Sequence, residues 1–334
     1  MDPITQGVLG ATASKAVAKP HEAIVASLLG FLAGMAADLD VLIKSNTDPL
    51  LALEYHRQFT HSLVFIPLGA LICAVCFHYL FSRKTLSFTR SYLFCLAGYA
   101  THALLDACTT YGTQLFWPFS STRFAWNNVS VVDPLFTLPL ALLAGLAIYR
   151  RAPRLALAGM LYALMYLALG VVQNHRALAI ANELAASRGH QALSIDVKPS
   201  FANIVVWKSV YQHAGRYYVD AIRVLRDRKV IEGSSTQILD VDQHFPWLDS
   251  ASQQARDIQR FAWFSNQHLA IDPNNPNRII DVRYSLIPNR LDGMWGIVLK
   301  QNAKSQEHVR WTTTRPNRQN MAKNMGLLWA MIMG

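Results

Sequence analysis

Two short stretches place side chains that can ligate a metal beside apolar sequence. The stretch HRQFTHS begins at His56 and contains Arg57 and His61, and the stretch HALLD runs from His102 to Asp106. A lone charged group in an apolar environment is costly, so buried ionisable side chains need partners. We therefore expect these residues to pair with one another, to bind a metal ion, or to serve only as hydrogen-bonded structural groups.

The spacing within each stretch indicates how the side chains come together. His102 and Asp106 are four residues apart, so on a helix they share one face and can contact one ion. His56 and His61 are five residues apart, which does not align them on a helix. A helix that starts near Thr60, its expected N-cap, with His56 in the preceding loop, lets both histidines point inward.

Three more carboxylates lie at the ends of apolar segments: Asp38, Asp40 and Asp133. Asp38 and Asp40 are two residues apart, which suits a frayed helix end. Imidazole combined with carboxylate is the ligand set of zinc, manganese or iron sites. Such a set can hold one or two divalent ions, and zinc is the expected metal.

The composition divides the chain into two parts. Of its 334 residues, 52% are hydrophobic and 16% are charged, against about 25% charged in ordinary globular domains. Residues 1–173 contain 11 Lys/Arg and 8 Asp/Glu, whereas the remaining residues contain 20 and 13. The net charge is +10, yet the basic residues form short clusters between apolar segments, so nucleic acid is not an expected partner.

Five apolar segments are long enough to cross a bilayer, which takes about 20 mostly apolar residues. They are residues 23–43, 63–82, 91–110, 131–149 and 154–173. Basic residues precede the first segment and occupy the loops at 83–90 and 150–154, which places those loops in the cytoplasm. The seven histidines and aspartates named above then all lie toward the outer side of the membrane. The orientation is inferred from Lys and Arg alone, so the location of all seven histidines and aspartates on one side is an independent indication of a site.

After the fifth segment the pattern changes to short runs rich in β-branched and aromatic residues. We expect a short helix at 176–189, then a β-rich domain at 190–315 with a helical insert near 249–262. The expected fold is an α-helical multi-pass membrane domain, residues 1–175, with about five transmembrane helices. A small, mostly antiparallel β-rich extracytoplasmic domain follows, residues 176–334.

Four stretches carry a family resemblance: MDPITQGVLGA, GMAADLDVL, HRQFTHSL and HALLDACTTYGTQLFWPF. Over residues 1–175 the chain resembles the LexA-regulated, membrane-associated hydrolase family, which comprises metal-dependent hydrolases of the bacterial inner membrane. The chain departs from that family at Gln6, where relatives carry His, and at Ala37, where they carry Pro. The resemblance implies a multi-pass membrane protein whose metal ligands are His56, His61, His102 and Asp106, to which we add Asp38.

These observations predict an integral membrane hydrolase that acts on a lipid or lipid-linked ester or phosphoester at the outer face of the inner membrane. Arg57 is expected to hold an anionic group of the substrate from a hydrated loop, or else to pair with Glu54 or Asp48. Asp40 or Asp133 is expected to act as a general base or to orient a ligating histidine. Two alternatives stay open: a transporter whose polar residues line a pathway, and a non-catalytic anchor in which they are structural.

Overall fold

The computed structural model describes residues 1–225, 227–314 and 317–334, and the chain divides into two compact units. The helical unit comprises Met1–Ile43, Tyr55–Val171 and Phe201–Asn203. The β unit comprises Lys44–Glu54, Val172–Ser200 and Ile204–Gly334. The segment Lys44–Glu54 therefore packs with the β unit, although its neighbours in the chain on both sides belong to the helical unit.

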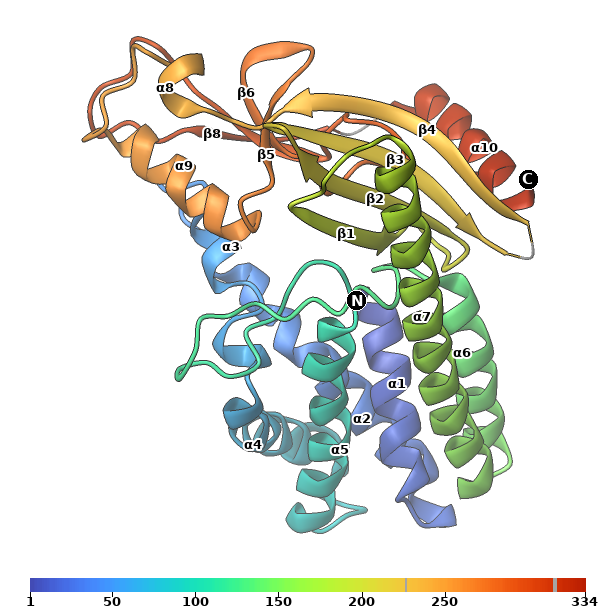
Figure 1. The fold of residues 1–334 in the computed structure, drawn as a ribbon. Helices are drawn as coiled ribbons and strands as arrows, with labels where there is room; N and C mark the ends of the chain where they lie inside the picture. Colours follow the sequence, from blue (N-terminus) through green and yellow to red (C-terminus); the bar gives the residue numbers. More distant parts are fainter. Residues whose placement is uncertain (226, 315–316) are drawn as a thin grey trace. The chain divides into compact units, whose positions relative to one another are not determined.

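The helices of the helical unit lie side by side (Figure 1). They are α1 Pro3–Ala16, α2 Ala23–Ala36, α4 Ile66–Phe77, α5 Phe88–Ala107, α6 Pro134–Tyr149 and the first part of α7, Pro153–Ser187. A 3-10 turn, Ala37–Leu42, follows α2, and a π turn, His78–Ser82, follows α4. The basic loops expected in the cytoplasm lie at one end of these helices (Figure 1). There Arg90 binds Glu22 and the carbonyl oxygen of Val17.

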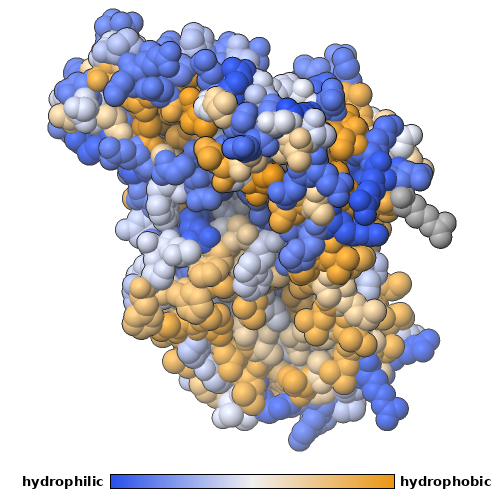
Figure 2. Space-filling view, viewed as in Figure 1, coloured by the Kyte–Doolittle hydropathy of each residue, from blue (hydrophilic) through white to orange (hydrophobic). Residues whose placement is uncertain are grey.

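Three helices among the described residues are long and apolar enough to cross a membrane: Pro20–Leu42, Leu63–Ser82 and Pro153–Ser187. They coincide with the first, second and fifth expected spans. The third and fourth expected spans also form helices, but α6 has only 16 residues and α5 carries His102 and Asp106. Length and composition thus support three of the five expected spans. The face of this unit seen in Figure 2 is mostly hydrophobic, as a lipid-facing surface requires.

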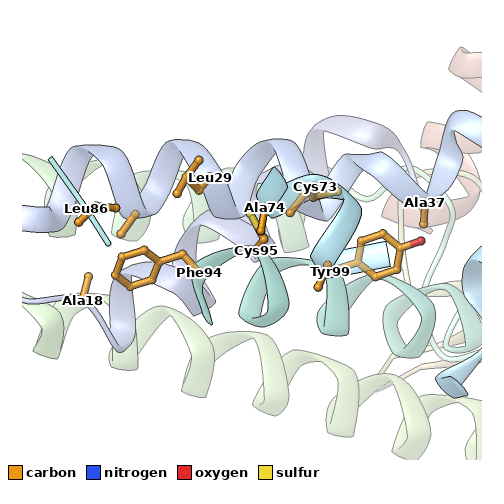
Figure 3. Close-up of a cluster of buried hydrophobic side chains, with 12 residues drawn as sticks. Ala18, Leu29, Ala37, Cys73, Ala74, Leu86, Phe94, Cys95 and Tyr99 are labelled. Carbon is orange, nitrogen blue, oxygen red and sulfur yellow. The ribbon is translucent and has the colours of Figure 1, made fainter. Parts of the chain in front are cut away.

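The helices α2, α4 and α5 pack around a core of small and aromatic side chains (Figure 3). Helices α2 and α5 approach so closely that a Cβ on Gly98 would overlap the carbonyl oxygen of Gly30. At the next residue of α5, the Tyr99 hydroxyl donates a hydrogen bond of 2.8 Å to the carbonyl of Thr60. These contacts bring the end of α2, the segment before α4 and the last turns of α5 together.

The helix α1 is an element that the apolar pattern does not indicate. Asp2 caps it by accepting a hydrogen bond of 3.0 Å from the Thr5 N–H, and proline follows at the first helical position. Polar side chains are buried along it and bind neighbouring helices; Ser14, for example, donates to the carbonyl of Phe94 at 2.7 Å. The helix packs on α2, α5 and α6. Its many polar residues explain why no apolar run marks it.

The described residues of the β unit form two four-stranded antiparallel sheets, each with its strands in chain order. The first sheet consists of β1 Ser194–Pro199, β2 Val206–His213, β3 Arg216–Val224 and β4 Arg228–Gln237. The second consists of β5 Leu269–Asp272, β6 Asn275–Asp281, β7 Trp295–Val298 and β8 Arg310–Thr313. The expected antiparallel β-rich region is confirmed, and the expected helical insert is α9, Gln253–Phe264.

The remaining helices include one that differs from expectation. We expect a separate helix at 176–189, but α7 continues without a break to Ser187. The prediction of two helices is wrong because residues 173–187 contain neither Gly nor Pro and are rich in Ala and Leu. Two short helices, α3 Leu51–Tyr55 and α8 Val241–His244, and the terminal helix α10 Arg318–Met333 complete the fold.

Candidate metal centre

Four side chains from three parts of the helical unit meet at one point. Asp38 stands in the 3-10 turn after α2, and His61 ends the 3-10 turn Phe59–His61. His102 and Asp106 lie on one face of α5, as their spacing predicts. The side chains of His61, His102 and Asp106 are fully buried, whereas that of Asp38 is 16% exposed.

The four atoms that face one another are spaced like the corners of a zinc tetrahedron. His61 Nε2 lies 2.9 Å from His102 Nε2, 3.5 Å from Asp38 Oδ1 and 3.2 Å from Asp106 Oδ2. His102 Nε2 lies 3.4 Å from Asp38 Oδ1 and 3.7 Å from Asp106 Oδ2. Zinc bonds of about 2.0–2.1 Å in tetrahedral geometry place ligand atoms about 3.3–3.4 Å apart. The five observed separations fall on both sides of this value.

The hydrogen bonds around the two histidines indicate which ring nitrogens carry protons. His102 Nδ1 lies 2.5 Å from the carbonyl oxygen of Gly34, which can only accept, so a neutral His102 presents a lone pair at Nε2. His61 Nδ1 lies 3.2 Å from Asp40 Oδ2 and 2.9 Å from Thr60 Oγ1. Thr60 Oγ1 donates its own proton to Asp40, so it accepts from His61. A neutral His61 therefore also presents a lone pair at Nε2.

When both histidines are neutral, the centre gathers electron-rich atoms that have no proton donor among themselves. Two carboxylate oxygens and two imidazole lone pairs facing one another repel unless a cation lies between them. Burial by itself lowers the pKa of His61, but the carboxylates of Asp106, Asp38 and Asp40 around it raise that pKa to about 10. The surroundings therefore favour a positive charge at this point, supplied by a proton or by a metal ion.

Asp106 is the member of this group with the most polar contacts. Its Oδ1 accepts hydrogen bonds from Gln6 Nε2 at 2.8 Å and from the amino group of Met1. Its Oδ2 is buried, lies 2.9 Å from Arg57 Nε and 3.2 Å from His61 Nε2, and makes no hydrogen bond among the described residues. This oxygen therefore has cationic or metal-competent groups around it and a lone pair that a metal ion could use. The residues present therefore fit a metal ion.

Asp40 supports the centre from behind His61. Its Oδ2 accepts hydrogen bonds from the backbone N–H of Arg57 at 3.0 Å and from Thr60 Oγ1 at 2.8 Å, besides its contact with His61 Nδ1. With these donors around it, Asp40 resembles the carboxylate of a carboxylate–histidine–metal arrangement. Of the two roles expected for Asp40, the geometry favours orienting a ligating histidine.

His56 lies beside the centre rather than in the tetrahedron. Its Nδ1 is 2.7 Å from Asp40 Oδ1, and its ring stands edge-on to that of Tyr111, with 5.3 Å between ring centres. His56, Asp38 and Asp40 form a second group whose atoms are close enough to hold an ion. The short hydrogen bond to Asp40 nevertheless favours an oriented base over a ligand. The role of His56 as a metal ligand stays a prediction.

Arg57 is not in the hydrated position that the sequence suggests. The residue is 4% exposed, its Nη1 donates to Thr109 Oγ1 at 2.9 Å, and its guanidinium carbon lies 4.8 Å from the centre of the Tyr111 ring. Its backbone has a φ of 64°, which is uncommon for a residue of this kind. The expected exposure is wrong because the bond from its N–H to Asp40 turns the residue inward, toward Asp106.

Asp133 is placed apart from these groups. Its Oδ1 accepts from the backbone N–H groups of Leu135 and Phe136 at 3.1 and 3.3 Å, so it caps α6, and the Tyr166 hydroxyl lies 3.0 Å from both its oxygens. It belongs to neither group of metal-competent side chains found among the described residues. Its role as a base or an orienting residue stays a prediction that these contacts do not support.

Three supporting groups are not evident from sequence patterns. Gln6 enters the centre from α1, and the only sign of it is the MDPITQGVLGA stretch of the resemblance. The carbonyl of Gly34 has no sequence signature at all. Thr60 is not the expected helix N-cap, because Ser62 takes that role by accepting from the Phe65 N–H, and Thr60 instead joins His61 to Asp40.

Comparisons with known proteins place the helical part of the chain. Among curated relatives, the uncharacterized protein YfhP of Bacillus subtilis (strain 168) is 30% identical over 128 residues, which are 38% of this chain and 37% of the relative. The inner membrane protein YbcI of Escherichia coli (strain K12) is 33% identical over 106 residues, 30% of this chain and 60% of that protein. The chain thus matches less than two thirds of the length of either relative. No solved structure is significantly similar. A family model described as YdjM inner membrane protein matches residues 1–177, more than half of the chain, and the protein therefore belongs to that inner-membrane family.

Proposed function

We propose that this protein is an integral membrane, metal-dependent hydrolase with a divalent ion bound by Asp38, His61, His102 and Asp106. The observation that carries the proposal is the buried tetrahedron of two imidazole lone pairs and two carboxylate oxygens, with separations of 2.9 to 3.7 Å. Zinc fits this size and this ligand set best, and manganese or iron share the same ligand types.

Asp38 is the proposed ligand at whose position water or substrate can reach the metal ion. Structural zinc sites have four protein ligands, whereas catalytic sites keep one position for water or substrate. The side chain of Asp38 is 16% exposed, while those of His61, His102 and Asp106 are at 0%. Substrate is therefore expected to approach from the side of Asp38.

The chain supplies a base next to this corner. A bound divalent ion polarises an acyl or phosphoryl oxygen and lowers the pKa of water toward about 7. His56, with its Nδ1 proton held by Asp40 Oδ1, can take a proton at Nε2 and return it to a leaving group. Its side chain is 20% exposed, so it can reach a substrate. Asp40 keeps both His56 and His61 in the required tautomers.

The surroundings favour an anionic lipid as substrate. The guanidinium groups of Arg57 and Arg123 lie 4.8 and 5.2 Å from the centre of the same Tyr111 ring, so two positive charges lie beside the centre. In the loop that follows Tyr111, the residues Phe116, Phe119 and Trp126 are 47%, 82% and 46% exposed. Exposed aromatic residues of this kind are typical of the membrane interface. We therefore infer a lipid or lipid-linked phosphoester at the outer face of the inner membrane.

The proposal is tested first by metal analysis of the full-length protein in detergent. The wild-type protein should contain about one zinc equivalent per chain, and His61→Ala, His102→Ala and Asp106→Ala should each lose it. His78→Ala is a matched control, because His78 is a histidine of the same unit that binds Ser91 instead. Equal metal content in all five proteins would show that the site is misassigned.

A hydrolysis screen on lipid phosphoesters then tests the activity. The wild-type protein should hydrolyse at least one class, and the three ligand variants should not. A protein that binds zinc at these ligands but hydrolyses no ester would favour the alternatives, a transporter or a structural centre.

A further inference from the structure

The segment Lys44–Glu54 connects two parts of the candidate metal centre. Asp38 and Asp40 precede it in the chain, and His56 and Arg57 follow it, yet it packs with the β unit. Within the segment, Asp48 accepts from the Leu50 N–H at 2.9 Å, Ser45 binds the following turn, and the Leu53 N–H donates to the Leu50 carbonyl at 2.9 Å. These bonds are local, so they shape the segment but do not fix it to the rest of the protein.

Arg260 of α9 holds the segment through its two carboxylates. Its Nη1 and Nη2 donate to the two oxygens of Asp48 at 3.0 and 2.7 Å, and its Nε donates to Glu54 Oε1 at 2.5 Å. This is the planar, two-point recognition for which a guanidinium is suited and an ammonium is not. Asp48 and Glu54 are the residues that the sequence offers as partners of Arg57, and the structure assigns both to Arg260 instead.

The helix that carries Arg260 is itself firmly anchored. Arg260 Nη1 also donates to Asp257 Oδ1 at 2.9 Å, and this fully buried carboxylate accepts from His308 Nδ1 at 2.9 Å and from the Val309 N–H at 3.1 Å. The apolar face of α9 is buried through Ile258, Phe261 and Phe264. The guanidinium therefore projects from a fixed base.

The charges make this contact decisive for the segment. Arg260 is the guanidinium that binds Asp48, Glu54 and Asp257 together. Without it, His308 Nδ1 stays 2.9 Å from Asp257 and 4.0 Å from Asp48, but the two-point grip on Asp48 and the bond to Glu54 are lost. The carboxylates then repel one another more strongly, because like charges at this distance repel. Without Arg260 the segment is expected to leave α9.

We propose that Arg260 is a positioning residue for the metal centre. By holding Lys44–Glu54, it fixes the distance between the two ends of that segment. Asp38 and Asp40 lie just before the first end, and His56 and Arg57 lie just after the second. The inference rests on the proposed metal site and assigns the β unit a role in it. The effect reaches the ion through Asp40, which binds His56, the Arg57 N–H and His61.

The test measures zinc affinity of the full-length protein in detergent by competition with a chromophoric chelator. Arg260→Ala should weaken zinc binding at least about tenfold, the usual effect of losing an outer support of a metal site. Arg256→Ala is the matched control: Arg256 lies on the same helix and, among the described residues, binds Gln253 and the carbonyl of Ala251, so the zinc affinity of this variant should equal that of the wild type. The absorption spectrum of the cobalt-substituted protein should change in the first variant alone.

A second set of variants approaches the contact from the segment. Asp48→Asn combined with Glu54→Gln should weaken zinc binding to a similar degree, and adding Arg260→Ala should cause little further loss, because the three residues act as one unit. This set still tests the proposal if Arg260→Ala alone does not fold.

The outcomes distinguish a failure of the positioning role of Arg260 from a failure of the proposed metal site. Zinc affinity and cobalt spectra like those of Arg256→Ala in both sets would overturn the positioning role while leaving the metal site intact. A wild-type protein that binds no zinc would overturn the proposed function, and this inference with it.

Discussion

At the scale of single residues, the candidate centre is defined by protons that its side chains lack. Neutral His102 donates its Nδ1 proton to the carbonyl of Gly34, and neutral His61 donates its Nδ1 proton to Asp40 and Thr60. Both rings therefore direct the lone pair of Nε2 to the point that the two carboxylates also face. The roles of the residues follow from this division. On the proposed function, side chains that direct a lone pair to the centre are the ligands, and side chains that accept a proton from those ligands orient them.

Asp40 and Asp133 should therefore respond differently to the loss of charge. Asp40→Asn removes an orienting carboxylate and is expected to weaken zinc binding about 10- to 100-fold without abolishing it. Asp133→Asn keeps a side chain that can cap α6, so zinc affinity should not change. Chelator competition on the purified proteins measures both. Equal affinities of the two variants would remove Asp40 from the centre.

Arg57 should matter most when no metal is bound. Arg57→Ala removes one of the two cations beside the buried Asp106, the other being the amino group of Met1. Losing one partner of a buried ion pair costs up to about 3–5 kcal/mol. A divalent ion at the centre would neutralise the Asp106 carboxylate. Zinc should therefore reverse most of the decrease in melting temperature that Arg57→Ala causes. Thermal unfolding with and without zinc tests this. A loss that zinc does not reduce would mean that Arg57 acts only through Thr109 and Tyr111.

Lys208 of β2 should give the β unit a distinctive pH dependence. Burial lowers its pKa to about 7, and its ammonium donates to Ser285 Oγ and the Arg290 carbonyl, both at 2.8 Å. Between that value and 10.5, the ordinary lysine pKa, the unfolded chain keeps a proton that the folded chain has released. Stability should therefore rise with pH in this window, by up to about 1.4 kcal/mol per pH unit.

Lys208→Met should abolish this rise. Melting curves of the detergent-solubilised protein from pH 7 to pH 9, followed by intrinsic fluorescence, compare the variant with the wild type. Parallel pH profiles in the two proteins would contradict the assignment of the rise to Lys208.

At the scale of elements, the sequence predicts the helices and residue pairs that have a regular spacing, and it does not predict contacts made by loops and backbone groups. The apolar segments and the i,i+4 pair of His102 and Asp106 have regular spacings, and the structure contains the corresponding helices. Three residues that orient the centre are Gln6, Gly34 and Thr60. Gln6 lies on a polar helix, Gly34 contributes a backbone carbonyl, and Thr60 lies in a 3-10 turn, so no regular spacing of residue types in the sequence indicates them. The inward turn of Arg57 depends on a single backbone bond to Asp40, so loop composition cannot predict its burial.

The close approach of α2 and α5 is an element-scale feature that can be tested. Gly98→Ala places a methyl group against the Gly30 carbonyl and should push the helices apart, lowering both the melting temperature and zinc binding. Gly145→Ala is the control, because its Cβ would meet open space, and it should be neutral or stabilising by up to about 1 kcal/mol. Normal zinc binding by a folded Gly98→Ala protein would show that the centre tolerates a wider helix spacing.

At the scale of the whole molecule, the direction in which the chain crosses the membrane determines which side the centre serves. Basic residues at the turns before α2, α5 and α7 favour a cytoplasmic location for that end of the helical unit. In a Cys76→Ala background, a membrane-impermeant maleimide added to intact cells should label Ser121→Cys and leave Lys84→Cys unlabelled; both positions are exposed. The reverse pattern would place the centre on the cytoplasmic side.

The complete burial of His61, His102 and Asp106 has a consequence for how the protein matures. These residues come from separate segments, and the side chain of Asp38, which is 16% exposed, is the member of the group nearest to solvent. On the proposed function, an ion would enter and leave past Asp38, and the buried ligands would have to shift locally to release it. Binding would then be linked to the packing of α5 against the segment before α4, and zinc exchange would be set by this local opening rather than by diffusion.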